Sequence, residues 1–339
     1  MFGTSWRMPA EWESHKRTWM AWPAADYILG DTAESAHQAR SAWASVANAI
    51  IEFEPVCMLV VESQLESARE YLDSRVELIS AELDDSWMRD IGPTFVKGTS
   101  QAELGKLGGV DWFFNGWGNQ NWTEWAKDSK IAKSINQIAG AIRLETPLIN
   151  EGGAIHVNGA GTVLLTKTVQ LGEGRNNMWS QSEVEAEIHR KLGTTKAVWF
   201  DRGLWRDYQE FGTRGHVDML AAFCDENRIV YHEQTNPEHP DFAVSQELKA
   251  TIEAAGFEPV PLTAPVTIKD EGGWVDYNYV NHYLCNGAVI LCGFDDPNDQ
   301  IAVSSLQALY PDRKIVLLDA RAIFERGGGI HCITQQEPA

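Results

Sequence analysis

Apolar runs of strand length alternate along this chain with longer segments of mixed polarity. Runs with the continuous apolar character of buried strands occupy Pro55–Glu62, Arg228–His232, Gly287–Phe294 and Lys314–Asp319. The chain between and around these runs is long enough to form helices. The pattern therefore predicts an α/β protein.

The clearest helix is predicted between Ser180 and Gly193. Ser180 and Glu183 have the spacing of a capping box, apolar residues then recur at every fourth position, and the glycine ends the pattern. Further helices are expected at about residues 36–53 and 245–255, and after Asn298, which we expect to cap its helix.

A glycine-rich pattern occurs more than once. "EGGAIHVNG" (Glu151–Gly159) and "RGGGIHCIT" (Arg326–Thr334) share a glycine pair that leads to an Ile-His pair. "EGGWVDYNYVN" (Glu271–Asn281) begins in the same way. In this register Cys332 takes the position of Val157, and the three segments are interpreted as copies of one repeat.

Two other polar stretches, "DDSWMRDIGP" and "TRGHVDM", extend the repeat. One marker from each stretch gives intervals of about 60 residues. The markers are Asp90, Glu151, His216, Glu271 and Gly327. Such units predict a pseudo-symmetric ring of βαβ-like blades whose polar loops converge on one axis. No linker rich in Pro, Gly or Ser divides the chain, so we expect one domain over residues 1–339.

The overall charge is strongly negative, because 28 basic and 48 acidic residues give a formal net charge of −20. A field of this sign disfavours nucleic acid and anionic membranes as partners and suits a small cationic substrate. The sequence shows no apolar run of bilayer length and no signal-like N-terminal run. Its five cysteines contain no CxxC pair, which argues against a disulfide framework or a zinc ribbon. We therefore expect a cytoplasmic protein with reduced thiols.

Convergence of the polar loops would gather Asp90, Glu151, His216, Asp218 and Cys332. If "GHVD" is a strand, its histidine and aspartate face the same side. Carboxylates raise the pKa of a nearby thiol unless the ligand brings a compensating positive charge. A guanidinium meets this requirement, because its planar nitrogens match carboxylates in a bidentate arrangement. A thiolate is the natural nucleophile for its poorly electrophilic carbon.

Each of these residues also has a structural explanation. An isolated cysteine is often a small buried apolar residue, and a histidine can simply be a hydrogen-bonded core residue. Asp90 can pair with Arg89, Glu151 can be a turn residue, and Trp87 can belong to the core. The three glycines before Cys332 favour the functional interpretation, because they let the backbone turn tightly and approach a ligand.

Motifs along nearly the whole chain resemble those of one known family. In order, they are "MPAEWESHKRTWMAWP" (Met8–Pro23), "DDSWMRDIGPTFV", "FNGWG" (Phe114–Gly118), "EGGAIHVNGAGTVLLT", "GHVD", "YVNHYLCNGAVI", "DDPND" and "GGGIHCITQQEP". The chain resembles the agmatine deiminase and bacterial peptidylarginine deiminase family of the guanidino-group-modifying pentein superfamily. The last motif is highly specific to that family.

The resemblance implies a fold and a set of catalytic roles. The fold would be a five-bladed pseudo-symmetric α/β propeller, the pentein fold, with the active site on the central axis. Cys332 would attack the guanidinium carbon, while Asp90 and Asp218 would hold the guanidinium nitrogens. His216 would protonate the departing ammonia and then activate water.

Further residues would shape the same site. Glu151 would belong to the polar network and help to hold the histidine or the substrate. Trp87 would lie against the substrate, and Gly329 would bring the backbone close to it. The resemblance implies no metal or organic cofactor, and by analogy it suggests a homodimer.

The segment before "GHVD" departs from the agmatine deiminase pattern. Phe211 and Gly212 occupy positions that are usually acidic, and Arg214 and Met219 replace two asparagines. Glu210 remains to meet the distal amine of a substrate.

Other residues of this segment leave the substrate open. Asp207 is a second candidate to meet an amine, whereas Arg206 and Arg214 suit a carboxylate or make structural ion pairs.

We expect hydrolytic deimination of agmatine to N-carbamoylputrescine and ammonia through a covalent Cys332 thiouronium intermediate. The alternative is the same chemistry on free L-arginine, a C-terminal peptidyl arginine or another carboxylate-bearing guanidino compound. An amidinotransferase and a catalytically silent binding protein are the remaining alternatives.

Overall fold

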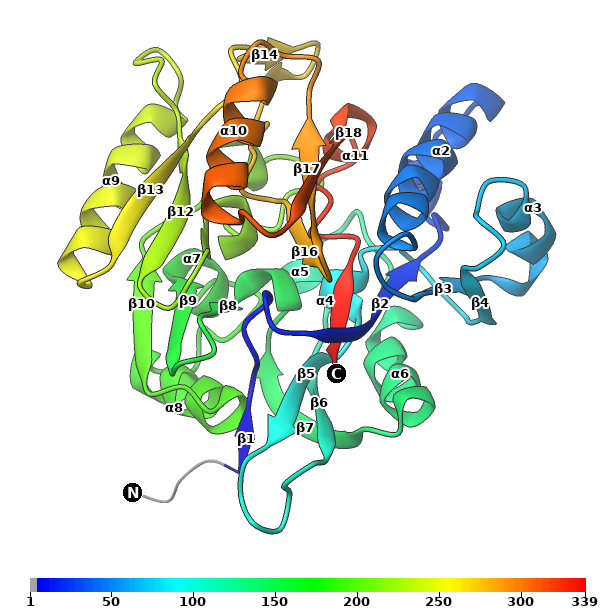
Figure 1. Ribbon diagram of the computed structural model, residues 1–339, viewed down its shortest axis with the longest axis horizontal. Coiled ribbons are helices and arrows are strands. Elements are labelled where there is room, and N and C mark those ends of the chain that lie inside the picture. The colour runs from blue at the N-terminus through cyan, green and yellow to red at the C-terminus, as the bar shows by residue number, and fades with distance from the viewer. Residues whose placement is uncertain (1–4) are drawn as a thin grey trace.

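Five sheets surround a central axis in the computed structural model, which describes residues 5–339 (Figure 1). In each sheet a short inner strand runs antiparallel to a middle strand, which runs parallel to an outer strand. Parallel neighbours need a crossover connection, whereas antiparallel neighbours can be joined by a tight turn. The repeated unit confirms the predicted five-bladed α/β propeller.

Each blade extends from its inner strand at the axis to its outer strand at the periphery. In that order the strands are β5, β6 and β7 (Thr94–Gly98, Leu107–Phe113, Ile142–Ile149); β8, β9 and β10 (His156–Val157, Thr162–Thr166, Lys196–Phe200); β11, β12 and β13 (Ala221–Phe223, Arg228–Glu233, Glu258–Thr263); β16, β17 and β18 (Tyr283–Cys285, Ala288–Gly293, Lys314–Asp319); and β19, β2, β3 and β4 (Gln335–Pro338, His15–Ala21, Val56–Val60, Glu77–Ser80). In addition, β1 (Trp6–Arg7) pairs with β5, and β14 and β15 (Lys269–Asp270, Gly273–Trp274) form a separate hairpin. The four predicted strands are present as β3, β12, β17 and β18, with small shifts at their ends.

Helices supply the crossovers and lie at the periphery of the ring (Figure 1). The crossover helices are α2 (Ala33–Ile50), α6 (Ile131–Ala139), α8 (Gln181–Leu192), α9 (Asp241–Ala254) and α10 (Asp299–Leu309). The shorter helices are α1 (Asp26–Leu29), α3 (Leu65–Arg69), α4 (Met88–Ile91), α5 (Gly116–Asn119), α7 (Lys167–Gln170) and α11 (Arg321–Phe324). Among residues 5–339, none of the helices is long and apolar enough to cross a membrane.

The predicted capping box of α8 is confirmed, since Ser180 and Glu183 exchange side-chain and backbone hydrogen bonds and Gly193 adopts a left-handed conformation. Asn298 is the N-cap residue of α10, as predicted, but its side chain makes no capping hydrogen bond. It donates instead to the carbonyl oxygen of Ala264 at 2.7 Å. This side chain therefore ties the loop to the end of the preceding blade.

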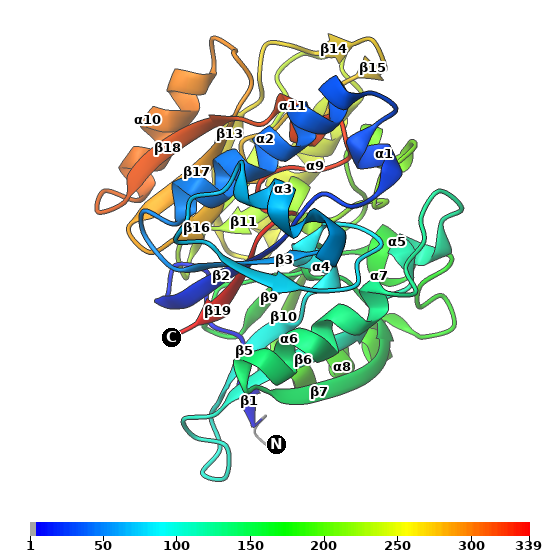
Figure 2. The same ribbon diagram turned by 90° about the vertical axis from the view of Figure 1, so that its right-hand side faces the viewer.

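The two ends of the chain meet in one blade. β19 pairs antiparallel with β2, and Figures 1 and 2 show the two strands side by side. Glu337 in β19 is completely buried and accepts a hydrogen bond from the indole nitrogen of Trp19 at 2.9 Å. The C-terminal segment is therefore packed and not frayed, and the ring is closed by this strand pair.

The loops that lead into the inner strands carry the candidate site residues. Asp90 lies in α4 just before β5, Glu151 precedes β8, Asp218 precedes β11, and Cys332 precedes β19. Because the inner strands surround the axis, the loops that precede them meet at one end of this axis.

The prediction that Glu271, the fourth marker of the sequence repeat, lies in the axial loop of its blade is wrong. Glu271 is exposed in the β14–β15 hairpin, away from the inner strand of its blade. The loop equivalent to the other four ends at Asn281, just before β16, and Asn281 is completely buried. The Glu-Gly-Gly match placed the marker in the wrong part of the blade, because a glycine pair serves any tight turn.

The predicted equivalence of Cys332 and Val157 is also wrong. Val157 lies within the inner strand β8, whereas Cys332 lies in a turn before the inner strand β19. Counted from the start of each inner strand, the position that corresponds to Cys332 is Gly153.

Candidate active site

Three polar side chains converge on one point beside Gly153. A carbon added at this glycine would lie 2.6 Å from His216 Nδ1, 2.9 Å from Asp90 Oδ1 and 3.0 Å from Asp218 Oδ2. Glycine therefore leaves room for all three groups. Its backbone N–H also donates to Asp90 Oδ1 at 2.9 Å, from the 3₁₀ turn Gly152–Ala154.

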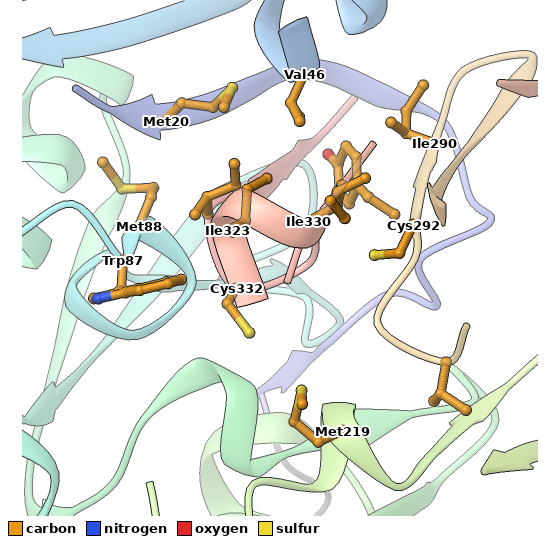
Figure 3. Packing of buried hydrophobic residues seen from close by; sticks show 14 of the residues in the cluster. Met20, Val46, Trp87, Met88, Met219, Ile290, Cys292, Ile323, Ile330 and Cys332 are labelled. Atoms are coloured by element: carbon orange, nitrogen blue, oxygen red, sulfur yellow. The ribbon is translucent and has the colours of Figure 1, made fainter. Parts of the chain in front are cut away.

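Cys332 belongs to the same cluster. Its sulfur lies 3.6 Å from Asp218 Oδ2, and a side chain on Gly328 would meet both this sulfur and the ring of Trp87. Figure 3 shows Ile330 packed in the hydrophobic core and the Cys332 sulfur directed away from it. The sequence predicts that the Cys332 sulfur lies close to His216, Asp90 and Asp218, and its contact with Asp218 is confirmed.

His216 and Asp218 reach this cluster from a turn and not from a strand. Val217–Met219 is a 3₁₀ turn, and β11 begins only at Ala221. The prediction that the two side chains share one face of a strand is therefore wrong. The turn is held in place by the carboxylate of Asp207, which accepts hydrogen bonds from the backbone N–H groups of Thr213, Gly215 and His216.

His216 is surrounded by carboxylates. Its Nε2 lies 3.3 Å from Glu151 Oε2, and its Nδ1 lies 3.8 Å from Asp90 Oδ2. Burial alone would lower the pKa of His216, but Asp90, Glu151 and Asp218 outweigh it and raise the pKa to about 9. Glu151 is itself ion-paired with Arg175 at 3.0 Å. His216 is therefore protonated at neutral pH and can act as an acid.

The Cys332 thiol is neutral in the free protein. Burial, Asp218 and Asp90 raise its pKa well above the ordinary value. Burial also raises the pKa of Asp90, whereas for Asp218 the hydrogen bond to His331 outweighs burial and lowers the pKa. A cation held between the two aspartates would supply the positive charge that favours a thiolate.

Two buried polar atoms in the cluster, Asp218 Oδ1 and His216 Nδ1, have no hydrogen-bond partner among residues 5–339. Leaving such a group unsatisfied costs about 1–3 kcal/mol. Asp90 is better supported, because the indole nitrogen of Trp117 donates to its Oδ2 at 2.8 Å. The free carboxylate oxygen of Asp218 is an acceptor for a ligand that donates hydrogen bonds, as a guanidinium does.

Aromatic side chains cover the cluster on the side of Trp87. The indole nitrogen of Trp87 donates to the hydroxyl group of Tyr27 at 2.7 Å, and Tyr27 stacks on Phe211 with ring centroids 4.8 Å apart. Trp122 meets both of these rings edge-on. Phe211 therefore contributes an aromatic surface at a position where we expected the loss of an acidic group to alter substrate binding.

An acidic cavity of about 440 Å³ opens beside Tyr27 and Trp122. The charged residues of its lining are Asp26, Asp84, Asp85, Glu124 and Lys127. Asp84 pairs with Lys127 at 3.4 Å, and burial raises the pKa of Asp85 to about 7. The remaining carboxylates, Asp26 and Glu124, favour a cation over an anion in this cavity.

The structure does not place Glu210 and Arg214 in the cluster around Cys332. Both side chains are exposed, and that of Arg214 makes no hydrogen bond or ion pair within residues 5–339. Arg206 pairs with Asp270 at 2.9 Å, which matches the structural ion pair considered for it. Gly329 does belong to the cluster, because its backbone N–H bonds to the Cys332 sulfur.

The sequence reasoning missed several side chains that support the site: Trp117, Arg175 and Asn281. Trp117 lies in the quoted motif "FNGWG", but a motif does not show which partner its indole reaches. Asn281 lies in the quoted motif "YVNHYLCNGAVI" and ends the segment Glu271–Asn281, but an uncharged amide gave no sign of a role there.

Comparisons with known proteins agree over nearly the whole chain. The model of the Porphyromonas-type peptidyl-arginine deiminase family matches residues 7–338. A Streptomyces coelicolor protein, provisionally named an agmatine deiminase, is 54% identical, over 98% of this chain and 99% of its own length. The agmatine deiminase of Ectopseudomonas mendocina is 34% identical, over 98% of this chain and 95% of its own length.

A solved structure shows the same similarity. The agmatine deiminase of Enterococcus faecalis, described as catalysing its reaction, superposes with a TM-score of 0.90 at 29% sequence identity. The superposition covers 100% of this chain and 98% of that one.

Proposed function

The chain belongs to the Porphyromonas-type peptidyl-arginine deiminase family, and we propose that it is a hydrolase that converts agmatine and water to N-carbamoylputrescine and ammonia. The observation that carries this proposal is the position of the Cys332 thiol beside Asp218, in a cluster that also contains Asp90 and a protonated His216. This set of groups matches a planar cation that is attacked by sulfur.

The first half of the reaction makes a covalent intermediate. Asp90 and Asp218 hold the guanidinium nitrogens and fix the plane of the group, which presents its carbon to Cys332. The positive charge of the substrate favours loss of the thiol proton to solvent. The thiolate forms the S–C bond, His216 gives a proton to one amino group, and the C–N bond breaks as ammonia leaves. The product of these steps is an S-alkylthiouronium on Cys332.

The second half releases the ureido product. Neutral His216 takes a proton from water, whose oxygen forms a bond to the thiouronium carbon. The C–S bond then breaks, its electron pair returns to sulfur, and the hydroxyl proton leaves to solvent. Glu151 holds the Nε2 side of the imidazole during both steps and stabilises its charged form.

The surroundings of the cluster favour a substrate with a cationic far end. The cavity beside Tyr27 and Trp122 is rich in carboxylates, and aromatic rings attract cations to their faces. This supports agmatine, which carries an amine, over a substrate that carries a carboxylate. The rival substrate class, guanidino acids such as L-arginine, is favoured by the free, exposed side chain of Arg214.

Ammonia release from a panel of guanidino compounds tests the proposal. We expect turnover of agmatine by the native chain and by Cys224→Ala, a control at another buried cysteine, and none by folded Cys332→Ala. Substantial turnover by Cys332→Ala, or no ammonia from any compound, would contradict the proposal. A higher kcat/KM for L-arginine that depends on Arg214, tested with Arg214→Ala, would favour the rival substrate class.

We further propose that the enzyme works in the cytoplasm. All five of its cysteines are free thiols, as is usual in a reducing compartment.

A further inference from the structure

The fourth blade contributes one side chain to the cluster, and that side chain is the amide of Asn281. Asn281 is completely buried and lies in the loop that enters β16, which corresponds to the loops that carry Asp90, Asp218 and Cys332 in other blades. Its contacts therefore show what this blade adds to the site.

Backbone partners fix the orientation of the Asn281 amide. Its Oδ1 accepts a hydrogen bond from the backbone N–H of His331 at 3.0 Å, and its Nδ2 donates to the carbonyl oxygen of Asp218 at 3.2 Å. The opposite orientation would place the amide nitrogen against the N–H of His331 and the amide oxygen against the carbonyl oxygen of Asp218. The nitrogen is therefore the amide atom nearer to the sulfur of Cys332, at 3.3 Å, while the oxygen lies 3.5 Å from the same sulfur.

The loop around Asn281 is built to hold this amide. Its own backbone N–H donates to the side-chain oxygen of Asn278 at 3.0 Å. A side chain on Gly329 would lie 2.4 Å from the Asn281 oxygen, so a glycine is needed there. Asn281 is thus held from both sides and does not need to move to reach the sulfur.

An amide donor suits the electrostatics of this place. Asp218 and Asp90 oppose a negative charge on the sulfur, whereas the hydrogen bonds from Gly329 and Asn281 favour it. A lysine or arginine would also favour a thiolate, but its charge would compete with a cationic substrate for the same carboxylates. A neutral donor stabilises the thiolate without occupying the cation site.

We propose that Asn281 is a catalytic residue, whose side-chain nitrogen donates a hydrogen bond to the Cys332 sulfur and stabilises the attacking thiolate. The same bond stabilises the sulfur when the C–S bond breaks and the electron pair returns to it. This inference rests on the proposed function for its catalytic meaning, but the reactivity of the thiol can be measured without turnover.

The decisive variant is Asn281→Asp, which keeps the shape of the side chain and replaces the donor nitrogen by an acceptor oxygen. The probe is iodoacetamide, and the readout is the rate at which Cys332 is alkylated as a function of pH, measured by peptide mass spectrometry without substrate. We expect the rate at a given pH to fall about 10- to 100-fold, because hydrogen bonds to charged groups are of that strength. The alkylation profile should also move to higher pH.

Asn278→Asp is the matched control. It adds a carboxylate in the same buried loop and keeps the oxygen that accepts the hydrogen bond from Asn281. The side chain at residue 278 does not contact the Cys332 sulfur. We expect alkylation of Cys332 to change far less in this control. Asn281→Ser, which shortens the side chain without adding charge, gives a second measurement if the aspartate variant does not fold.

The outcomes separate this inference from the proposed function. Alkylation of Cys332 at the native rate and pH in a folded Asn281 variant would overturn the role of Asn281, as would an equal loss in the Asn278 control. A native chain that is alkylated as expected but releases no ammonia would contradict the proposed function alone. If the proposed function and the role of Asn281 are both correct, kcat of Asn281→Asp should fall more than its KM rises, since the amide contacts the sulfur and not the substrate.

Discussion

Asp218 illustrates how single residues in this protein serve several partners. Its Oδ2 lies 2.8 Å from His331 Nδ1 and 3.6 Å from the Cys332 sulfur, while its Oδ1 has no partner among residues 5–339. On the far side of His331, Nε2 lies 2.9 Å from Glu11. The pKa of His331 is raised despite burial, because both carboxylates favour its charged form. In turn, the hydrogen bond with His331 outweighs burial and lowers the pKa of Asp218, which favours the carboxylate form that binds a substrate cation.

At the same scale, the raised pKa of His216 predicts the alkaline limit of activity. His216 is protonated below its pKa of about 9 and loses its proton as the pH rises through that value. We expect kcat/KM to fall over this range, because the acid needed for loss of ammonia disappears. A pH profile of agmatine turnover measures this. An alkylguanidine without an amine is the control, since it excludes titration of the substrate's own amine, and a decline centred near pH 7 would contradict the assignment.

At the scale of the elements, the loop of residues 207–216 is shaped by one carboxylate. Asp207 is buried, and it accepts hydrogen bonds from the backbone N–H groups of Thr213, Gly215 and His216. Within this loop Phe211 and Arg214 adopt positive φ angles of 65° and 71°. Such conformations are unfavourable for residues other than glycine, so the loop depends on these bonds.

We therefore expect Asp207→Asn to displace His216. The variant replaces an acceptor oxygen by a donor nitrogen that faces backbone N–H groups, which should cost about 1.5–3 kcal/mol of stability. Activity should fall by about 100-fold, because a shift of about 1 Å in a catalytic group has that effect. Thermal unfolding and kcat/KM measure the two effects.

The matched control for this change is Asp201→Asn. Asp201 is exposed and pairs with Lys167 at 2.6 Å, so its loss should change stability by less than about 1 kcal/mol. Native-like activity in Asp207→Asn would show that His216 is held in place by other contacts.

At the scale of the whole molecule, the ring is closed by the last strand. β19 is buried along its length and pairs with β2, while Glu337 is held by Lys16 and Arg17 from the same partner strand. Cys332 lies immediately before β19, so closure of the ring and placement of the nucleophile depend on the same segment.

A chain that ends at Thr334 should lose both the closed ring and the active site. It would leave the Trp19 indole and the backbone groups of β2 without partners, at about 1–3 kcal/mol for each buried group. Circular dichroism and thermal unfolding measure the loss. Glu337→Gln is the control, because it keeps the strand and removes only the charge. A truncated chain with native unfolding behaviour would contradict the proposed role of β19.

Much of this architecture and chemistry could be predicted from the sequence. The repeat interval predicted the number of blades, although one marker and the register of Cys332 were wrong, because a glycine pair also fits turns outside the axis. The terminal motif directed attention to Cys332, and the charged residue types pointed to a cation that is attacked by sulfur. These features are local, since they depend on residue type and on spacing along the chain.

Only the tertiary structure decided which side chains meet. The amide of Asn281 reaches the sulfur of Cys332, and the indole of Trp117 reaches Asp90, because closure of the ring brings loops of different blades to one axis. The same closure buries Asp207 as a loop anchor and leaves Arg214 exposed, although both are charged residues of one segment. Composition and periodicity cannot separate such residues, since burial and partners are set by contacts between distant parts of the chain.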